Sequence, residues 1–493
     1  MTEKSSLYDV VIIGGGIVGC AIARELSRYE LKIAVLEKEA DVGWGISCRN
    51  SGVVHAGFNY TSGTLRAKLC VKGNKTFEKL CQELDVPFKK IGKFVVALKK
   101  DELEELKRLK EQGEKNGVEG LKIVDEKELK KAEPHIRGIA ALYSPNTAIT
   151  SPYGLTIALA ENAHKNGVRF FLNSEVTAIK KNHSEFEIHT NSKKFQARYL
   201  INCAGLYSDK ISRLTGAEKY RIYPCRGEYF VLDKNASHLI DHLVYPVPKA
   251  GSGGLGVHIT PTVDGNILLG PSNEYVKKKD NLAATSKVMK KLIDESRDFL
   301  PLISGRDIIR SYAGIRSKQA PSSEGGYWDF VIEESKIVSR FINLVGIESP
   351  GLTAAQPIAQ KVVQMIHEKE SLKPNTNFTP FRKGILCFEE QSETMKKNLI
   401  REDPDYGEII CRCEKVTKKE ILQAIDNPLG AKDLVSIKYR SRAMMGRCQG
   451  GYCLTRIIEL LREKYDLSPQ EITLKGNHSS LLTGYRSDEV EIS

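Results

Sequence analysis

The chain has 493 residues, of which 41% are hydrophobic and 28% charged, and its formal net charge is +12 at pH 7. This length is too great for one hydrophobic core, so two or three domains are expected. No apolar run reaches the ~18–20 residues of a transmembrane segment, and the first residues do not have the pattern of a signal peptide. We therefore expect a cytoplasmic protein that reaches a membrane only through a partner. The sequence shows no basic stripe with interleaved aromatic residues, so we do not expect nucleic acid binding.

The first predicted unit is a strand, a glycine-rich loop, a helix and a second strand. An apolar run predicts the strand Tyr8–Ile13, a helix follows over Ile17–Tyr29, and the second strand spans Lys32–Glu37. A βαβ unit needs about 30 residues, and this segment supplies that length. The order of these elements is typical of the start of a nucleotide-binding domain.

The loop of this unit has the spacing of a dinucleotide fingerprint. The pattern Gly14-x-Gly16-x-x-Gly19 allows a tight turn, a close approach to a pyrophosphate and close packing of the helix on the strand. The helix N-terminus would face the phosphates, and Glu37 ends the second strand, where an acid can bind ribose hydroxyls. An ordinary glycine-rich turn is the alternative, which the surrounding strands and helix disfavour.

The rest of the chain alternates predicted helices and strands before its composition changes. We expect helices at 99–117, 155–165 and 354–368, and strands at 168–172, 185–190, 197–202, 227–233, 266–270, 330–333 and 341–346. The stretch 373–407 mixes proline, asparagine and charged residues, which indicates a linker. The last ~85 residues then form a small domain around four cysteines, a size typical of metal-dependent folds.

A series of short motifs resembles the D-amino-acid-oxidase-like flavoproteins. Residues 47–58 (Ser-Cys-Arg-Asn-Ser-Gly-Val-Val-His-Ala-Gly-Phe) look like the loop after the second strand in the branch of glycerol-3-phosphate oxidases and L-2-hydroxyglutarate oxidases. Similar motifs at 150–152, 175–176, 202–209, 226–229 and 346–353 follow in the same order. The resemblance covers about residues 7–370, and the motifs are specific as a set.

This resemblance implies FAD and an α/β fold, with a Rossmann-like FAD-binding domain and a β-rich substrate lobe. The domain would span 1–370, with its FAD-binding lobe at about 1–90, 150–225 and 335–370, its substrate lobe at about 91–149 and 226–334, and a linker at 371–408. A helix that opens near residue 351 can stabilise negative charge on reduced flavin. The residues expected to bind the cofactor are Gly14, Gly16, Gly19, Glu37, Ser47, Arg49, Asn50, Ser51, Val176, Ala204, Gly205, Gly346, Gly351, Leu352 and Thr353.

The same resemblance implies a set of catalytic residues. His55 is the candidate base, because an imidazole titrates near neutrality and can take a hydroxyl proton while hydride moves to the flavin. His258 is a second candidate, for substrate binding or a share of the acid–base work. Arg316 matches the arginine that holds the substrate anion, since its guanidinium suits a carboxylate or phosphate. Tyr229 and Ser349 are expected to line the pocket. Structural histidines and a surface salt bridge are the alternatives.

Four cysteines near the C-terminus form a C-x-C pair, Cys411 and Cys413, and a C-x4-C pair, Cys448 and Cys453. Four thiolates are an iron–sulfur ligand set. Zinc takes the same ligands, but its pairs usually enclose two to four residues; unliganded cysteines are a third reading. A capping box at 417–420 predicts a helix just after the first pair. The spacing resembles the bacterioferritin-associated-ferredoxin-like domain, which implies a [2Fe–2S] cluster in a small, mainly helical domain at 409–493.

Together the two resemblances imply a flavoprotein dehydrogenase of the glycerol-3-phosphate dehydrogenase type. It would oxidise a small anionic substrate, glycerol 3-phosphate, to dihydroxyacetone phosphate, and pass electrons through the cluster to a second redox subunit in an oligomer or complex. One departure is Gly254-Leu255-Gly256, where glycerol-phosphate oxidases of this branch tend to carry a lysine; residues 255–260 look more like the hydroxyglutarate enzymes. L-2-hydroxyglutarate or another 2-hydroxy acid is therefore an alternative substrate, and an amino acid such as proline a third. A non-enzymatic electron-transfer or scaffold subunit is the alternative class, which His55 with Arg316 disfavours.

Overall fold

The computed structural model describes residues 7–248 and 256–482, which form two compact units. The first comprises the chain up to Lys38 and Val42–Lys383, and the second comprises Glu39–Asp41 and the chain from Gly384. The first unit contains two lobes, each built on its own β-sheet. Gly254 and Leu255, where the sequence departs from the glycerol-phosphate oxidases, lie outside the described residues.

The first lobe begins with the predicted strand–helix–strand unit. β1 (Leu7–Ile13) pairs in parallel with β2 (Ile33–Leu36), and α1 (Ile17–Leu26) connects them. The helix ends at Leu26 rather than at the predicted Tyr29, because the backbone beyond it pairs elsewhere. Tyr29 forms an isolated antiparallel bridge with Pro374: the Glu30 N–H donates to the Lys373 carbonyl oxygen at 2.8 Å, and the Asn375 N–H donates to the Arg28 carbonyl oxygen at 2.7 Å.

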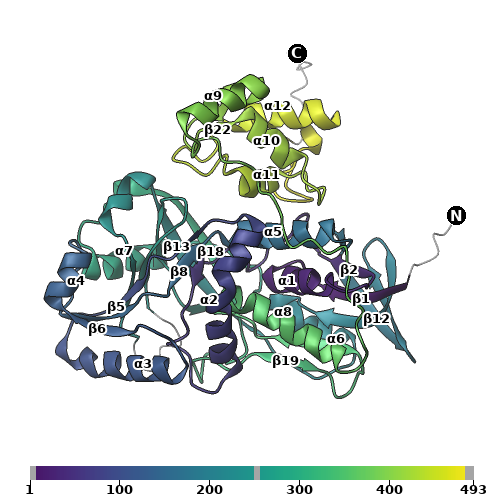
Figure 1. Cartoon of the computed structure of the whole chain (residues 1–493), viewed down its shortest axis with the longest axis horizontal. Helices are drawn as coiled ribbons and strands as arrows, with labels where there is room; N and C mark the ends of the chain where they lie inside the picture. The colour runs from purple at the N-terminus through teal and green to yellow at the C-terminus, as the bar shows by residue number, and fades with distance from the viewer. Residues whose placement is uncertain (1–6, 249–255, 483–493) are drawn as a thin grey trace, which may run out of the picture. The chain divides into compact units, whose positions relative to one another are not determined.

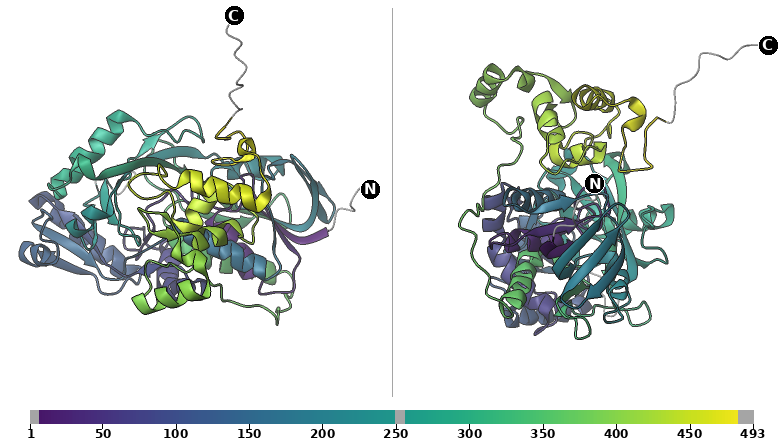
Figure 2. Two further views of the ribbon diagram at one scale, coloured as in Figure 1. Left: turned by 90° about the horizontal axis from the view of Figure 1, so that it is seen from above. Right: turned by 90° about the vertical axis from the view of Figure 1, so that its right-hand side faces the viewer.

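β1 lies inside an eight-stranded mixed sheet. The order is β10 (Val176–Asn182), β11 (Glu185–Thr190), β12 (Lys194–Asn202), β1, β2 and β9 (Arg169–Phe171), with β20 (Phe341–Val345) on β12 and β19 (Val331–Glu334) on β20. The strands β20, β12, β1, β2 and β9 run parallel, so their carboxyl ends share one edge. In the right-hand view of Figure 2 the blue to teal strands form a layer beside the dark purple α1. A ligand is expected outside this edge.

Three further helices pack around α1 in the first unit: α2 (Leu65–Leu84), α5 (Pro152–Lys165) and α8 (Gly351–His367). α1 packs against α5 and α8, and α2 packs against α8 (Figure 1). No helix was predicted where α2 lies, since a glycine inside a polar segment weakens a helix prediction. The structure explains Gly73, because a Cβ added to it would lie 2.0 Å from the Thr353 carbonyl oxygen.

The second lobe is built on a nine-stranded sheet. Its order is β17 (Glu274–Tyr275), β13 (Tyr223–Leu232), β16 (Ile267–Gly270), β15 (His258–Pro261), β14 (Leu243–Pro246), β5 (Lys93–Ala97), β7 (Ala140–Ser144) and β6 (Lys122–Asp125), and β18 (Ile308–Lys318) pairs with β13. Figure 1 shows α3 (Leu103–Lys115), α4 (Glu126–Ala132) and α7 (Ser286–Phe299) in this lobe. A small sheet of β3 (Val53–Val54), β8 (Ala148–Thr150) and β4 (Phe88–Lys89) completes the unit.

The second unit is small and mainly helical. It contains α9 (Glu393–Glu402), the β21 (Ile409–Cys411) and β22 (Val416–Thr417) pair, α10 (Lys418–Ile425), α11 (Leu434–Ser441) and α12 (Leu454–Tyr465) around one apolar core. The predicted capping box is confirmed: the Glu420 N–H donates to Thr417 Oγ1, and the Thr417 N–H donates to the Glu420 carboxylate. Within the described ranges, no helix is long and apolar enough to cross a membrane.

The segment predicted as a linker, 371–408, divides between the two units. In the first unit, Arg382 forms an ion pair with Glu161 at 2.7 Å, and the Arg382 N–H donates to the Glu83 carbonyl oxygen. The part of the segment from Gly384 belongs to the second unit and contains α9. The segment is therefore packed along both units rather than extended over its whole length.

The near contact of α2 with α8 generates a stability prediction. Gly73→Ala should lower the free energy of unfolding by about 1–3 kcal/mol, the usual cost of overpacking, because the Thr353 backbone cannot withdraw as a flexible side chain could. Thermal unfolding of the purified protein measures the effect. Gly305→Ala is the matched control, since a Cβ at Gly305 would meet no atom within 4 Å. Equal melting temperatures for both variants would contradict the packing argument.

Candidate active site and cysteine centre

The glycine loop after β1 has the geometry of a phosphate site. Gly14 has φ = +108°, and a Cβ on it would lie 2.5 Å from the Cys203 carbonyl oxygen, so this turn requires glycine. α1 begins directly after the loop, and its N-cap is Gly16, which has no side chain to occupy the helix N-terminus. The positive end of the helix therefore faces the loop, where a pyrophosphate can bind.

Two side chains from the predicted cofactor-binding residues accept hydrogen bonds from this loop. The Ile17 N–H donates to Ser47 Oγ at 2.8 Å, and the Gly15 N–H donates to the Glu37 carboxylate at 2.6 Å. Glu37 follows β2, so the carboxylate fixes the loop from the neighbouring strand. Its expected contact with the ribose stays a prediction.

The other predicted cofactor residues lie at strand ends and helix starts around the same edge. Arg49, in the loop before β3, has a buried Nε without a hydrogen-bond partner, and its Nη1 donates to the Ala313 carbonyl oxygen. An unsatisfied guanidinium N–H suits a negatively charged cofactor group. The residues present therefore fit FAD. Asn50 and Ser51 follow Arg49, Val176 opens β10, Ala204 and Gly205 follow β12, Gly346 follows β20, and Gly351, Leu352 and Thr353 open α8.

His55 lies directly after β3 and is fixed against the start of α8. Its backbone N–H donates to Thr353 Oγ1 at 3.0 Å, and its Nε2 lies 3.4 Å from Ser349 Oγ. The Tyr60 hydroxyl lies 3.1 Å from the same oxygen. Burial, with the charge of Lys93 and the ring of His258 as further causes, holds the pKa of His55 well below 6.5. The imidazole is thus neutral at neutral pH, which is the form that accepts a proton.

His258 opens β15 and is held in one tautomer. Its Nδ1 lies 2.9 Å from the Gly256 carbonyl oxygen, which can only accept, so Nδ1 carries the proton and Nε2 is the basic nitrogen. The ring stacks on Tyr245 with centroids 3.8 Å apart and an interplanar angle of 11°. Burial lowers the pKa of His258 to about 3. Like His55, this imidazole is neutral over the physiological range.

Arg316, on β18, carries a positive charge that uncharged groups hold in place. Its guanidinium donates to the Ser272 carbonyl oxygen and to Asn273 Oδ1, each at 3.3 Å. These acceptors orient the fork without neutralising it, so it can still bind an anion. Opposite β18, Tyr229 on β13 stacks on Tyr312 with centroids 4.8 Å apart.

The structure brings the predicted catalytic and pocket residues together. His55 and Ser349 are in contact, His258 is electrostatically coupled to His55, and the charge of Arg316 contributes to the low pKa of His258. The charge of Arg316 also acts on Tyr229. Sequence reasoning missed Lys93, Tyr60 and Tyr245, which surround the histidines. A lysine at the head of the apolar strand Lys93–Ala97 was the one available signal.

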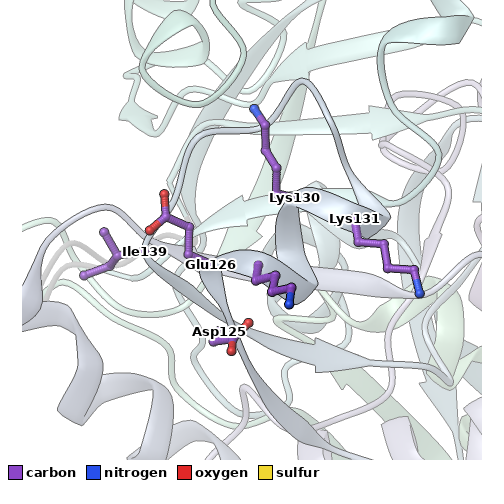
Figure 3. Close-up of a pocket in the computed structure, with 6 residues that line it drawn as sticks. Asp125, Glu126, Lys130, Lys131 and Ile139 are labelled. Atoms are coloured by element: carbon purple, nitrogen blue, oxygen red, sulfur yellow. The ribbon is translucent and has the colours of Figure 1, made fainter.

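A surface hollow beside α4 lies outside this set of residues. In Figure 3 the side chains of Lys130 and Lys131 extend away from each other, so no group of like charges converges on one point. We assign this hollow no part in the active site. Its lining residues are Asp125, Glu126, Lys127, Lys130, Lys131 and Ile139.

The four C-terminal cysteines meet as two pairs. Cys413 Sγ and Cys448 Sγ are 3.5 Å apart and both residues are exposed. Cys411 and Cys453 are buried, and a hydrogen bond from Cys453 lowers the pKa of Cys411, which favours the metal-binding thiolate. Cys453 is also the N-cap of α12, whose positive end can offset the negative charge of a cluster.

Two pairs of thiols suit two irons better than one zinc. A [2Fe–2S] cluster uses four thiolates spread over two metals, whereas a structural zinc needs all four around one point. The cysteine geometry therefore fits the cluster.

Comparisons with known proteins agree with both sites. A family model described as FAD dependent oxidoreductase matches residues 9–365, and one described as BFD-like [2Fe-2S] binding domain matches residues 409–463. These matches confirm both resemblances, the mixed α/β fold, and FAD and a [2Fe–2S] cluster as the cofactors.

Individual relatives cover most of the chain. A glycerol 3-phosphate dehydrogenase of Caloramator mitchellensis is 41% identical over 98% of this chain and 100% of the relative. The mitochondrial L-2-hydroxyglutarate dehydrogenase of Homo sapiens is 32% identical over 75% of this chain and 91% of the relative. The structure of L-alpha-glycerophosphate oxidase from Mycoplasma pneumoniae with FAD bound has a TM-score of 0.72 at 30% identity, and the match covers 76% of this chain and 98% of that one.

The cysteine pairs generate a metal prediction. Cys411→Ser should remove the cluster, and with it about two irons per chain, while the flavin stays bound because its residues lie in the other unit. Iron analysis and visible absorbance of the purified protein measure both cofactors. Cys387→Ser is the matched control, since Cys387 is exposed in the same unit and outside the four-cysteine set. One zinc per chain with no iron in the unaltered protein would refute the cluster.

Proposed function

Because the chain belongs to the FAD-dependent oxidoreductase family and carries a BFD-like [2Fe–2S]-binding domain, we propose that it oxidises glycerol 3-phosphate to dihydroxyacetone phosphate. The observation that carries this proposal is the meeting of two neutral, buried histidines with the guanidinium of Arg316. This set can take a proton from the hydroxyl group of a substrate whose anionic group is bound by the arginine. The 41% identity to a glycerol 3-phosphate dehydrogenase over nearly the whole chain supports the choice of substrate.

In this proposal each residue has one task. Arg316 binds the phosphate, because its fork presents two parallel N–H groups to an anion. His55 accepts the hydroxyl proton at Nε2, and Ser349 with Tyr60 holds the ring in position. His258 presents Nε2 as a second acceptor. When bound, FAD supplies the hydride acceptor, and the N-terminus of α8 near Gly351 offers positive potential for negative charge.

L-2-hydroxyglutarate is the second candidate substrate. It is also an anionic secondary alcohol, so the same proton acceptors and the same arginine could serve it. The 32% identity to the human L-2-hydroxyglutarate dehydrogenase supports this alternative. A solved L-proline dehydrogenase from P. horikoshii matches at 22% identity with a TM-score of 0.65, a likeness that supports the fold alone.

Anaerobic flavin bleaching tests the proposed reaction. Glycerol 3-phosphate should reduce the flavin of the purified enzyme faster than L-2-hydroxyglutarate or L-proline at equal concentrations. His55→Ala should slow this reduction by about 10²–10⁴-fold, the usual cost of losing a general base, without loss of FAD. His164→Ala is the matched control, since His164 lies on α5 and its ring bonds to the Val168 carbonyl oxygen. Faster bleaching by L-2-hydroxyglutarate would contradict glycerol 3-phosphate as the substrate and favour L-2-hydroxyglutarate.

We further propose that electrons leave through the cluster to a second redox subunit, in the cytoplasm or at the surface of a membrane. The cluster supplies a one-electron carrier, and a simple oxidase would not need one. The exposure of Cys413 and Cys448 supports this direction, because it leaves one side of the cluster accessible to an acceptor.

Stopped-flow spectroscopy without oxygen tests the relay. After substrate is added, the flavin absorbance should fall first and the cluster absorbance should follow within one turnover, because the cluster is the next acceptor. Cys411→Ser should keep the first phase and lose the second. A cluster that stays oxidised through many turnovers, together with fast oxygen consumption, would make the small domain structural.

A further inference from the structure

Lys93 is a buried charge that the proposed mechanism does not yet use. It opens β5 and is 0% exposed, and its Nζ has no hydrogen-bond partner. The Nζ lies 4.3 Å from the ring centroid of Phe58 and 4.5 Å from that of Tyr245. A buried ammonium held only by aromatic faces destabilises a fold, since neither ring replaces the lost hydration. Its presence therefore calls for a functional reason.

The neighbours of Lys93 connect it to both histidines. Tyr245, one of its two ring partners, stacks on the imidazole of His258 at 3.8 Å. Phe58, the other ring partner, lies on the same loop as His55. Cys70 of α2 completes the surroundings, because its thiol donates to the His55 carbonyl oxygen at 3.3 Å. Lys93 is thus separated from His258 by the ring of Tyr245, and its other ring partner, Phe58, is close in sequence to His55.

We propose that Lys93 is the positioning residue of this site, whose ammonium charge keeps His55 and His258 unprotonated and ready to accept the substrate proton. The inference rests on the proposed function in one respect, namely that these imidazoles receive the proton. Lys93 acts through the histidines and need not touch substrate.

The electrostatics agree with this role. The charge of Lys93 lowers the pKa of both His55 and His258, after burial, which is the larger cause for each. Two further groups influence the pKa values of Lys93 and the two histidines. Cys70 acts on Lys93 and is itself influenced by Arg66, and Arg316 acts on His258. Within the described part of the chain none of these is a carboxylate, so nothing in the set neutralises the ammonium. Burial lowers the pKa of Lys93 itself to about 7.

The sign of the effect follows from these charges. Below pH 7 Lys93 is charged and repels a proton from either imidazole, so both histidines stay neutral into acid solution. Removing the charge should raise the pKa of each histidine, although burial, the larger cause, still holds it below 6.5. A protonated imidazole cannot accept the substrate proton. The difference between the wild type and an uncharged variant should therefore appear in acid solution, where the histidines titrate, and be absent at neutral pH and above.

Lys93→Met in the holoenzyme tests the proposal, because methionine keeps the length and apolar stem of lysine. NMR titration of ring-labelled histidines should show the midpoint of His55 rising by about one pH unit, as expected for the loss of a nearby unit charge. His55→Asn and His258→Asn assign the signals. The acid limb of flavin reduction should move upward by the same amount. The melting temperature should stay equal or rise, since a buried unpaired charge is lost.

Lys181→Met is the matched control. Lys181 also has a buried Nζ without a hydrogen bond, 3.9 Å from the ring centroid of Phe186, but it lies on β10 in the other lobe. Its removal should move neither histidine. Unchanged midpoints in a folded Lys93→Met protein would overturn the proposal, and Lys93→Gln gives the same test if the methionine variant fails to fold. The titration needs no substrate, so it stands or falls separately from the choice of glycerol 3-phosphate.

Discussion

The meeting of three segments at Thr353 is the constraint on which the active site depends. The Thr353 hydroxyl accepts the backbone N–H of His55, and its carbonyl oxygen lies where only a glycine, Gly73 of α2, can approach. These contacts fix the start of α8 against the loop that carries the proposed base. Because α8 also packs on α1, the same arrangement connects the glycine loop to the proposed catalytic residues. The spacing between the glycine loop and His55 is thereby set by helix packing, not by flexible loops.

Local patterns in the sequence predicted the parts of this arrangement that depend on neighbours in the chain. The glycine loop and the capping box at Thr417 each act through residues a few positions apart. The four cysteines were recognised by their local spacing, although Cys413 contacts Cys448 from the other motif. The motif around His55 and the arginine at 316 were found through resemblance to known flavoproteins. In the structure His55 follows β3 and Arg316 lies on β18, so the two residues come from different sheets.

The features that sequence reasoning missed depend on contacts between distant strands and helices. α2 contains a glycine in its centre, and only the approach of α8 shows why a helix tolerates it. In the sequence, Lys93 is a single charged residue at the start of an apolar strand. Its surroundings become visible only through the pairing of β5 with β14, which brings Tyr245 close to its ammonium group. Just beyond α1, Arg28 and Glu30 form backbone hydrogen bonds with Asn375 and Lys373, more than 300 positions away. Such effects follow from tertiary pairing and leave no periodic trace.

The two chemical steps proposed here need opposite degrees of burial, and the chain provides them in different units. Proton removal from an alcohol benefits from a dry site, where electrostatic interactions are strong, and His55, His258 and Lys93 are all buried. One-electron export needs an accessible cluster, and Cys413 and Cys448 are exposed. A single pocket could not satisfy both conditions, because opening it to an electron acceptor would admit water to the histidines. Separate units allow the flavin site to stay closed while the cluster meets a partner, which gives a physical reason for joining these two domains in one chain.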